Sequence, residues 1–174
     1  MLWLRSLGMV LVVGATTLMG IGFYLKEKYR LQDLKLLEQA MLQIQQQIVY
    51  MGSPLPEVFA CVGRQMGGQI GSILQEIANQ MQQHTQETAE EIWKSVWLQQ
   101  AQLTYFANED LEMIIQFGKL WGGWDKQKQQ NNMTYFMKEL QQKQNLLQKK
   151  LEKNGKMYCG IGVLGGLMLI VVLL

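Results

Sequence analysis

The side chains that most enzymes use for chemistry are sparse in this sequence. His84 is the only histidine in 174 residues, and no serine motif beside it suggests a catalytic triad. The sequence contains no glycine-rich phosphate loop ending in Lys-Ser or Lys-Thr, and no His-Glu-x-x-His zinc motif. Cys61 and Cys159 are far apart, a spacing typical of neither a disulfide framework nor a metal site. We therefore expect a non-enzymatic protein without catalytic residues, cofactor or metal.

The clearest cluster of carboxylates indicates the start of a helix rather than an acid–base pair. Glu87, Glu90 and Glu91 directly precede or begin an apolar helical pattern, and acidic side chains there favour the positive end of the helix dipole. Thr88 and Glu91 have the spacing of a capping box. His84 is interpreted as a helix-end or surface residue, because nothing nearby completes a metal set.

The charge distribution is not typical of a nucleic-acid-binding protein. The chain has 16 Lys and Arg residues against 14 Asp and Glu residues, a net charge of +2. The basic residues gather beside two uncharged segments and do not form a dispersed basic face. We therefore expect no nucleic-acid partner.

Two uncharged apolar runs predict membrane helices at both ends of the chain. Leu7–Leu25 has nineteen residues and Met157–Leu174 has eighteen. Eighteen helical residues span about 27 Å, close to the roughly 30 Å hydrocarbon core of a bilayer. A cleaved signal peptide is the alternative for the first run, but the run is long for one and Leu18–Gly22 contains no clear Ala-x-Ala site. We predict transmembrane helices over residues 1–25 and 157–174, with a domain over residues 26–156 between them.

The basic residues beside these runs predict how the chain is oriented. Arg5 alone lies outside the first run, whereas seven basic residues lie on the domain side, which the positive-inside rule places in the cytoplasm. These seven are Lys26, Lys28, Arg30, Lys149, Lys150, Lys153 and Lys156. The expected location is therefore the cell membrane, with the domain cytoplasmic.

Small residues recur at a spacing of four in both runs. Thr16 and Gly20 form one such pair, and Gly162 and Gly166 form the other. Pairs of this kind allow close helix packing in a membrane, either between the two spans or with a partner, so a homo-oligomer is possible. Glycine is also simply common in membrane helices, and the sequence leaves both interpretations open.

Residues 26–156 predict an all-α domain. Proline occurs only twice, and the abundance of Leu, Met, Gln, Glu and Lys favours helices. The first helix, residues 26–51, has a heptad stripe that is short for a free coiled coil, so packing within the domain is favoured over self-association. The stripe comprises Leu34, Leu37, Met41, Ile44, Ile48 and Met51.

Turn signals divide the rest of the domain into five further helices. Ser53 is a candidate N-cap with Pro54 at the first helical position, and Gly67-Gly68 ends that helix. The others are expected over 69–83, after Thr88, from Asn108 to about Gly122, and from residue 126 into the last apolar run. Their predicted core faces are Ile70, Ile73, Leu74, Ile77 and Met81; Ala89, Ile92, Trp93, Val96 and Trp97; Leu111, Ile114, Ile115, Phe117 and Trp121; and Met133, Met137, Leu140, Leu147 and Leu151, interrupted by Gln144. The predicted fold is a six-helix bundle with its first and last helices antiparallel.

Several motifs together resemble one protein family. The pattern Phe117-Gly118-x-x-x-Gly122-x-x-Asp125-x-x-x-Gln129 resembles the signature of the stage III sporulation protein AB family of endospore-forming bacteria. The turn that contains Pro54 and Glu57, a tryptophan at Trp93, and the segment from Lys156 through Gly162 and Gly166 also resemble that family. The likeness extends over nearly the whole chain. Trp121 stands where the family usually has leucine, and the middle of the chain is unusually rich in glutamine.

The resemblance implies a specific function and specific partners. The family is a membrane component of the apparatus that joins the mother cell to the forespore. Its soluble domain is similar to cytoplasmic domains of the platform protein of type II secretion and type IV pilus machines. By analogy, this chain would contact the sporulation ATPase encoded beside it and would couple that ATPase to ring-forming components of the channel.

The residues of the signature also have a physical interpretation. Glycine costs about 1 kcal/mol of helix propensity relative to alanine, so Gly118 suggests a close crossing and Gly122 a helix end. Asp125 is a candidate N-cap of the last helix, with Gln129 bonding back to the turn. On this interpretation the signature fixes the angle between the fifth and sixth helices.

Two alternatives to a scaffold remain. A membrane-bound enzyme is disfavoured by the missing motifs, and a pore is disfavoured because neither apolar run contains the charge expected of an ion path. A membrane-anchored helical interaction protein of unspecified partner is the less specific form of the scaffold hypothesis.

Overall fold

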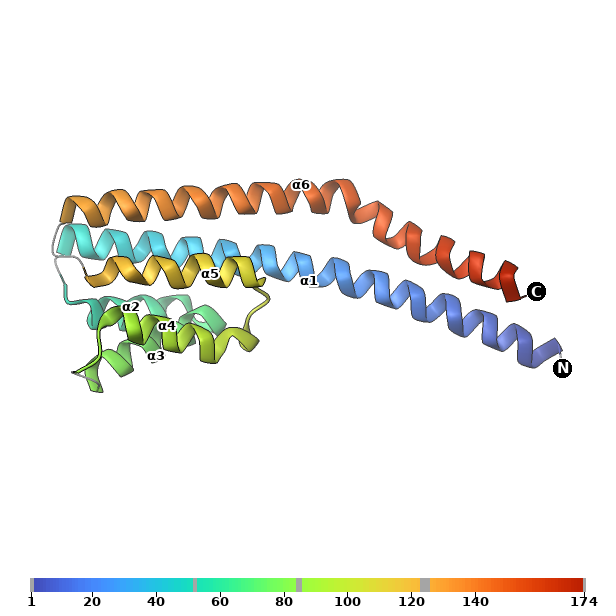
Figure 1. The fold of residues 1–174 in the computed structure, drawn as a ribbon, viewed down its shortest axis with the longest axis horizontal. Coiled ribbons are helices and arrows are strands. Elements are labelled where there is room, and N and C mark those ends of the chain that lie inside the picture. The colour runs from blue at the N-terminus through green and yellow to red at the C-terminus, as the bar shows by residue number, and fades with distance from the viewer. Residues whose placement is uncertain (1, 52, 84–85, 123–125, 174) are drawn as a thin grey trace. The chain divides into compact units, whose positions relative to one another are not determined.

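The described part of the chain is helical wherever it has regular secondary structure. The computed structural model describes residues 2–51, 53–83, 86–122 and 126–173, with side chains for residues 14–15, 18–48, 53–83, 86–119, 121 and 130–153. Six α-helices and two short 3₁₀ helices occur in these ranges, without a strand (Figure 1). The predicted all-α class is confirmed.

The α-helices follow one another in the order that the sequence predicted. The helices are α1 (Leu2–Met51), α2 (Leu55–Met66), α3 (Gly68–Gln83), α4 (Ala89–Gln100), η1 (Ala101–Leu103), α5 (Asn108–Phe117), η2 (Gly118–Gly122) and α6 (Lys126–Leu173). The chain forms two compact units, residues 1–31 with 145–174, and residues 32–144. We call them the terminal unit and the bundle; α1 and α6 each contribute to both.

Both uncharged runs are helical, the first within α1 and the second, up to Leu173, within α6. Most of their side chains, including those of Thr16 and of the segment around Gly162 and Gly166, lie outside the described residues. Within the part of the chain that the structure describes, no helix is long and apolar enough to cross a membrane.

In the bundle, α1 and α6 lie antiparallel, as expected. Gln144 of α6 contacts Leu34 of α1, and Gln141 contacts Glu38, so residue numbers rise along one helix as they fall along the other. The predicted stripe of α1 is buried at Leu34, Leu37, Met41 and Ile44, and that of α6 at Met133, Met137 and Leu140. These helices therefore form a shared apolar seam.

The remaining helices pack in sequence order. Helix α2 packs on α3, α3 on α4, and α4 on α5 and η2. The α2–α3 turn uses Gly67 and Gly68, which both have positive φ, so the predicted break at this pair is confirmed. Helices α2 and α3 cross closely at Gly63 and Gly71, since a Cβ added to Gly71 would lie 2.5 Å from the Gly63 carbonyl oxygen.

The helix starts match the predictions with one correction. Thr88 and Glu91 form the predicted capping box, with the Glu91 amide donating to Thr88 Oγ1 at 3.2 Å and the Thr88 amide donating to the Glu91 carboxylate at 2.8 Å. At α2, however, Pro54 is itself the N-cap, and its carbonyl accepts from the Glu57 amide at 3.0 Å. The assignment of Ser53 as N-cap and Pro54 as first helical residue was wrong by one position.

The fifth helix also differs from the prediction. The α-helical part ends at Phe117, and Gly118 to Gly122 form the 3₁₀ helix η2. The buried face includes Asp110 and Met113, whereas the predicted Leu111 and Ile115 are only half-buried. The helix is turned in this way because the carboxylate of Asp110 has polar partners inside the bundle, described below.

Candidate functional site

Trp93 of α4 lies at the centre of an aromatic cluster in the bundle. It is fully buried, and its indole Nε1 donates to the Ile114 carbonyl oxygen of α5 at 2.7 Å. Its ring centroid lies 5.6–6.0 Å from four other aromatic rings. The cluster consists of Phe59, Trp93, Trp97, Phe106, Phe117, Trp121 and Phe136. The interpretation of Trp93 and Trp97 as core residues is confirmed.

Gly118 leaves the space that the Trp93 ring occupies. A Cβ added at Gly118 would collide with Cδ1 of the indole and lie 2.9 Å from its Cγ. The backbone at Gly118 has φ −55° and ψ −28°, which every residue type adopts, so the glycine is required for space alone. The expected close crossing at Gly118 is therefore present, and the group that approaches is the side chain of Trp93.

Phe117 and Trp121 extend this contact to other helices. Phe117 stacks on Phe136 of α6, with ring centroids 4.2 Å apart, and Trp121 meets Phe59 of α2 edge to face at 5.1 Å. Aromatic pairs of this kind add about 0.5–1.5 kcal/mol each beyond the burial of their area. The residues around Gly118 thus connect the end of α5 to α2, α4 and α6.

The other predicted signature residues are not part of this contact. Gly122 is the last residue of η2. Asp125 and the side chain of Gln129 lie outside the described residues, so the predicted cap and back-bond stay predictions. Pro54 and the exposed Glu57 lie at the start of α2.

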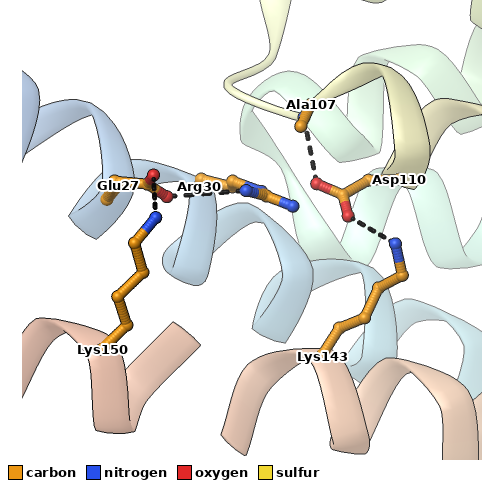
Figure 2. Close-up of polar contacts among 6 residues, drawn as sticks. All are labelled: Glu27, Arg30, Ala107, Asp110, Lys143 and Lys150. Carbon is orange, nitrogen blue, oxygen red and sulfur yellow. Dashed lines mark hydrogen bonds and ion pairs between the residues drawn. The ribbon is translucent and has the colours of Figure 1, made fainter. Parts of the chain in front are cut away.

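A second group of buried polar residues holds the segment that leads into α5. The Asp110 carboxylate is fully buried, accepts from the Ala107 amide at 3.0 Å and pairs with Lys143 of α6 at 3.1 Å (Figure 2). Lys143 also donates to the Glu109 carbonyl oxygen at 3.3 Å. This contact stabilises the packing of α5 against α6, because breaking a buried ion pair would leave an uncompensated charge. The sequence prediction placed Asp110 in the first turn but did not find its partner.

Asp33 of α1 ties the same segment to the first helix. Its Oδ2 accepts a hydrogen bond from the Tyr105 amide at 2.8 Å. Burial raises the pKa of Asp33 above its ordinary value of 3.8, and the hydrogen bond from Tyr105 opposes that shift. The two residues are 72 positions apart, and no local pattern connects them.

A third polar contact joins α1 directly to α6. The Glu38 carboxylate accepts from Gln141 Nε2 at 2.7 Å and from Gln144 Nε2 at 2.8 Å. Gln144 is buried and also donates to the Leu34 carbonyl oxygen at 3.2 Å. The interruption of the apolar stripe at Gln144 was the sequence signal of this contact. A single polar residue in an apolar seam fixes the register of two helices.

In the terminal unit, one acidic residue joins the two helices. Glu27 of α1 lies 3.0 Å from Lys150 of α6 and 3.5 Å from Arg30 (Figure 2). Four of the other lysines predicted to set the topology are exposed: Lys26, Lys28, Lys149 and Lys153. The side chain of Lys156 lies outside the described residues.

The contacts described above position the helices of the bundle and of the terminal unit. Within the part of the chain that the structure describes, no three His, Cys, Asp or Glu side chains are grouped as a metal site requires. The absence of a cofactor stays a prediction.

Comparisons with known proteins agree with the family resemblance. A family model described as stage III sporulation protein AB matches residues 5–174. A solved structure titled "Stage III sporulation protein AB" is similar with a TM-score of 0.67 and 16% sequence identity, covering 71% of this chain and 96% of that chain. At this identity the structural likeness shows the fold. A comparison with curated protein sequences gives no match.

Proposed function

Because the chain belongs to the stage III sporulation protein AB family, we propose that it is a non-enzymatic platform in the membrane of the mother cell. The family gives the chain a role in sporulation. The more specific proposal is that the platform couples a cytoplasmic ATPase to ring-forming components of the channel between mother cell and forespore. The observation that carries it is the family match over residues 5–174, which includes the bundle and all of both uncharged runs.

Attachment to the bilayer is part of the proposal. Each uncharged run is long enough to cross the hydrocarbon core as a helix, and α1 and α6 continue without interruption from the runs into the bundle. A platform of this kind needs a well-packed domain for its partners. The fixed register of α1 and α6 within the bundle and the Gly118–Trp93 contact support that role.

The ATPase proposal can be tested by co-purification from sporulating cells. A tagged full-length chain is extracted in mild detergent and captured, and the ATPase encoded beside it is sought among the bound proteins. The matched control is a chain that lacks residues 32–144, which removes the bundle and keeps both uncharged runs. We expect capture with the full chain and none with the control. Equal recovery in both, or no ATPase in either, would overturn the coupling.

Two further measurements separate this function from its alternatives. The purified chain should hydrolyse no ATP by itself, because it contains no phosphate-binding loop. Robust turnover would favour an enzyme, and ion conductance after reconstitution would favour a pore.

A further inference from the structure

The terminal unit carries most of the excess positive charge of the protein. It contains eight basic and two acidic residues, a net charge of +6, whereas residues 32–144 carry a net charge of −4. The acidic residues are Glu27 and Glu152. A strong positive charge confined to one part of a molecule attracts an anionic partner over about one Debye length, roughly 8–10 Å.

The contact between Glu27 and Lys150 brings the basic residues of two helices to the same level. Glu27 is already engaged by Lys150 and Arg30, and Glu152 accepts a hydrogen bond from Gln148 at 3.0 Å. Lys26 and Lys28 flank Glu27 on α1, and Lys149 and Lys153 lie beside Lys150 on α6. None of these four ammonium groups has an acidic partner among the side chains that the structure describes. Lys26 and Lys28 are two positions apart and point to different faces of α1, whereas Lys149 and Lys153 are four apart and share one face of α6. We call these four exposed residues, which lie at about the same level of the two helices, the lysine patch.

The position of the lysine patch indicates which anionic partner it fits. Lys26 directly follows the run Leu7–Leu25, and Lys153 lies four residues before Met157. Lys149 is eight residues before Met157, about 12 Å along a helix. If the runs enter a bilayer, the patch therefore lies at the level of the lipid headgroups. A soluble acidic protein would have to compete with that surface for the same charges.

We propose that the lysine patch binds the headgroups of anionic phospholipids, so that the platform selects an anionic lipid shell at its base. The inference rests on the proposed attachment to the membrane and adds a partner to it. Basic residues just outside a membrane helix each add attraction to an anionic leaflet. The attraction is electrostatic and must weaken as salt rises.

The test uses the full-length chain in nanodiscs of phosphatidylcholine with a minor fraction of spin-labelled lipid. Electron paramagnetic resonance gives the motionally restricted fraction for spin-labelled phosphatidylglycerol and, separately, for spin-labelled phosphatidylcholine. We expect a several-fold preference for phosphatidylglycerol at low salt that decreases at high salt. The preference for phosphatidylglycerol should disappear when glutamine replaces Lys26, Lys28, Lys149 and Lys153. It should remain when arginine replaces the same four lysines.

A matched control removes the same charge from the bundle. Lys35, Lys94, Lys119 and Lys138 are exposed, and their replacement by glutamine should leave the lipid preference unchanged. If both glutamine variants lose the preference for phosphatidylglycerol equally, the net charge of the protein causes that preference. This result would contradict a specific role of the lysine patch. A wild-type chain that enters the nanodiscs without any preference overturns the lipid proposal alone. A chain that does not enter the bilayer overturns the proposed attachment and the lipid surface together.

Discussion

A single missing carbon at Gly118 determines how closely α5 and η2 approach Trp93. The backbone there is ordinary, and the indole fills the space that a Cβ would take. Replacing Gly118 by alanine should therefore destabilise the bundle by about 1–3 kcal/mol, the usual cost of overpacking a core. Chemical denaturation of the full chain in detergent, followed by tryptophan fluorescence, measures this loss.

The double variant with Trp93→Phe identifies the cause. A smaller ring should relieve the collision, so the two substitutions should cost less together than the sum of their separate effects. The control is Gly22→Ala, where an added Cβ meets nothing within 4 Å. Strictly additive costs at Gly118 and Trp93 would contradict the contact.

Asp33 should make stability depend on pH in a direction opposite to that of most carboxylates. Burial raises its pKa in the folded protein above the ordinary 3.8, so the folded state holds this proton more tightly than the unfolded state. Its contribution to stability is complete below pH 3.8 and is lost as pH rises through the raised folded pKa. Asp33→Asn removes this titration and retains an acceptor for the Tyr105 amide.

The measurement is the unfolding free energy of both proteins between pH 3.5 and pH 7. Relative to Asp33→Asn, the wild type should lose stability as pH rises, while carboxylates common to both proteins cancel. A difference that stays constant across this range, or grows in favour of the wild type, would rule out the raised pKa.

Among the elements, α1 and α6 depend on Glu38 for their register. Two glutamine amides of α6 converge on this carboxylate, and hydrogen bonds to a charged group contribute about 1.5–3 kcal/mol. Glu38→Ala should destabilise the bundle by about 2 kcal/mol because it leaves the buried amide of Gln144 without one of its acceptors. Gln39 is exposed beside it, so Gln39→Ala is the matched control, with little expected change. Equal effects of the two substitutions would show that the contact contributes nothing specific.

Local sequence signals were sufficient to predict the helices but not the contacts between them. The Gly67-Gly68 break and the Thr88 capping box act within a few residues, so the helix boundaries around them could be predicted. The contact of Asp33 with Tyr105 spans 72 positions, and the sequence contains no signal for it. The rotation of α5 was missed because its apolar pattern does not reveal that Asp110 pairs with Lys143.

The candidate site was predictable in part for the same reason. Gly118 and Trp93 were each singled out, the first as a glycine in a helical pattern and the second as an aromatic residue at core spacing. Their mutual contact joins α4 to the end of α5 and depends on tertiary packing. The close crossing at Gly63 and Gly71 was missed because two glycines eight residues apart on different helices form no recognisable motif.

At the scale of the whole molecule, the distribution of basic residues predicts which side of the membrane holds the bundle. Cys61 and Cys159 are replaced by alanine, and a single cysteine is placed at the exposed Lys94. A membrane-impermeant maleimide should label this cysteine only after the cells are permeabilised, because the positive-inside rule keeps the bundle in the cytoplasm. A cysteine at Arg5, on the other side of the first run, is the control and should react in intact cells. Labelling of Lys94→Cys in intact cells would place the bundle outside and end the ATPase proposal.

The contact of Glu38 with Gln141 also constrains the order in which the protein can be made and folded. The two residues are 103 positions apart, and at typical synthesis rates of 5–20 residues per second the ribosome needs about 5–20 s to pass from one to the other. The α2–α3 hairpin can pack early because its contacts are local. The apolar stripe of α1 stays without its partner α6 until the segments of α2 to α5 have been synthesised. We expect arrested nascent chains that end before Lys126 to be cut by protease near Lys35, and released full-length chains to be protected there. Equal protection would mean that another partner, such as a chaperone, covers α1 while translation continues.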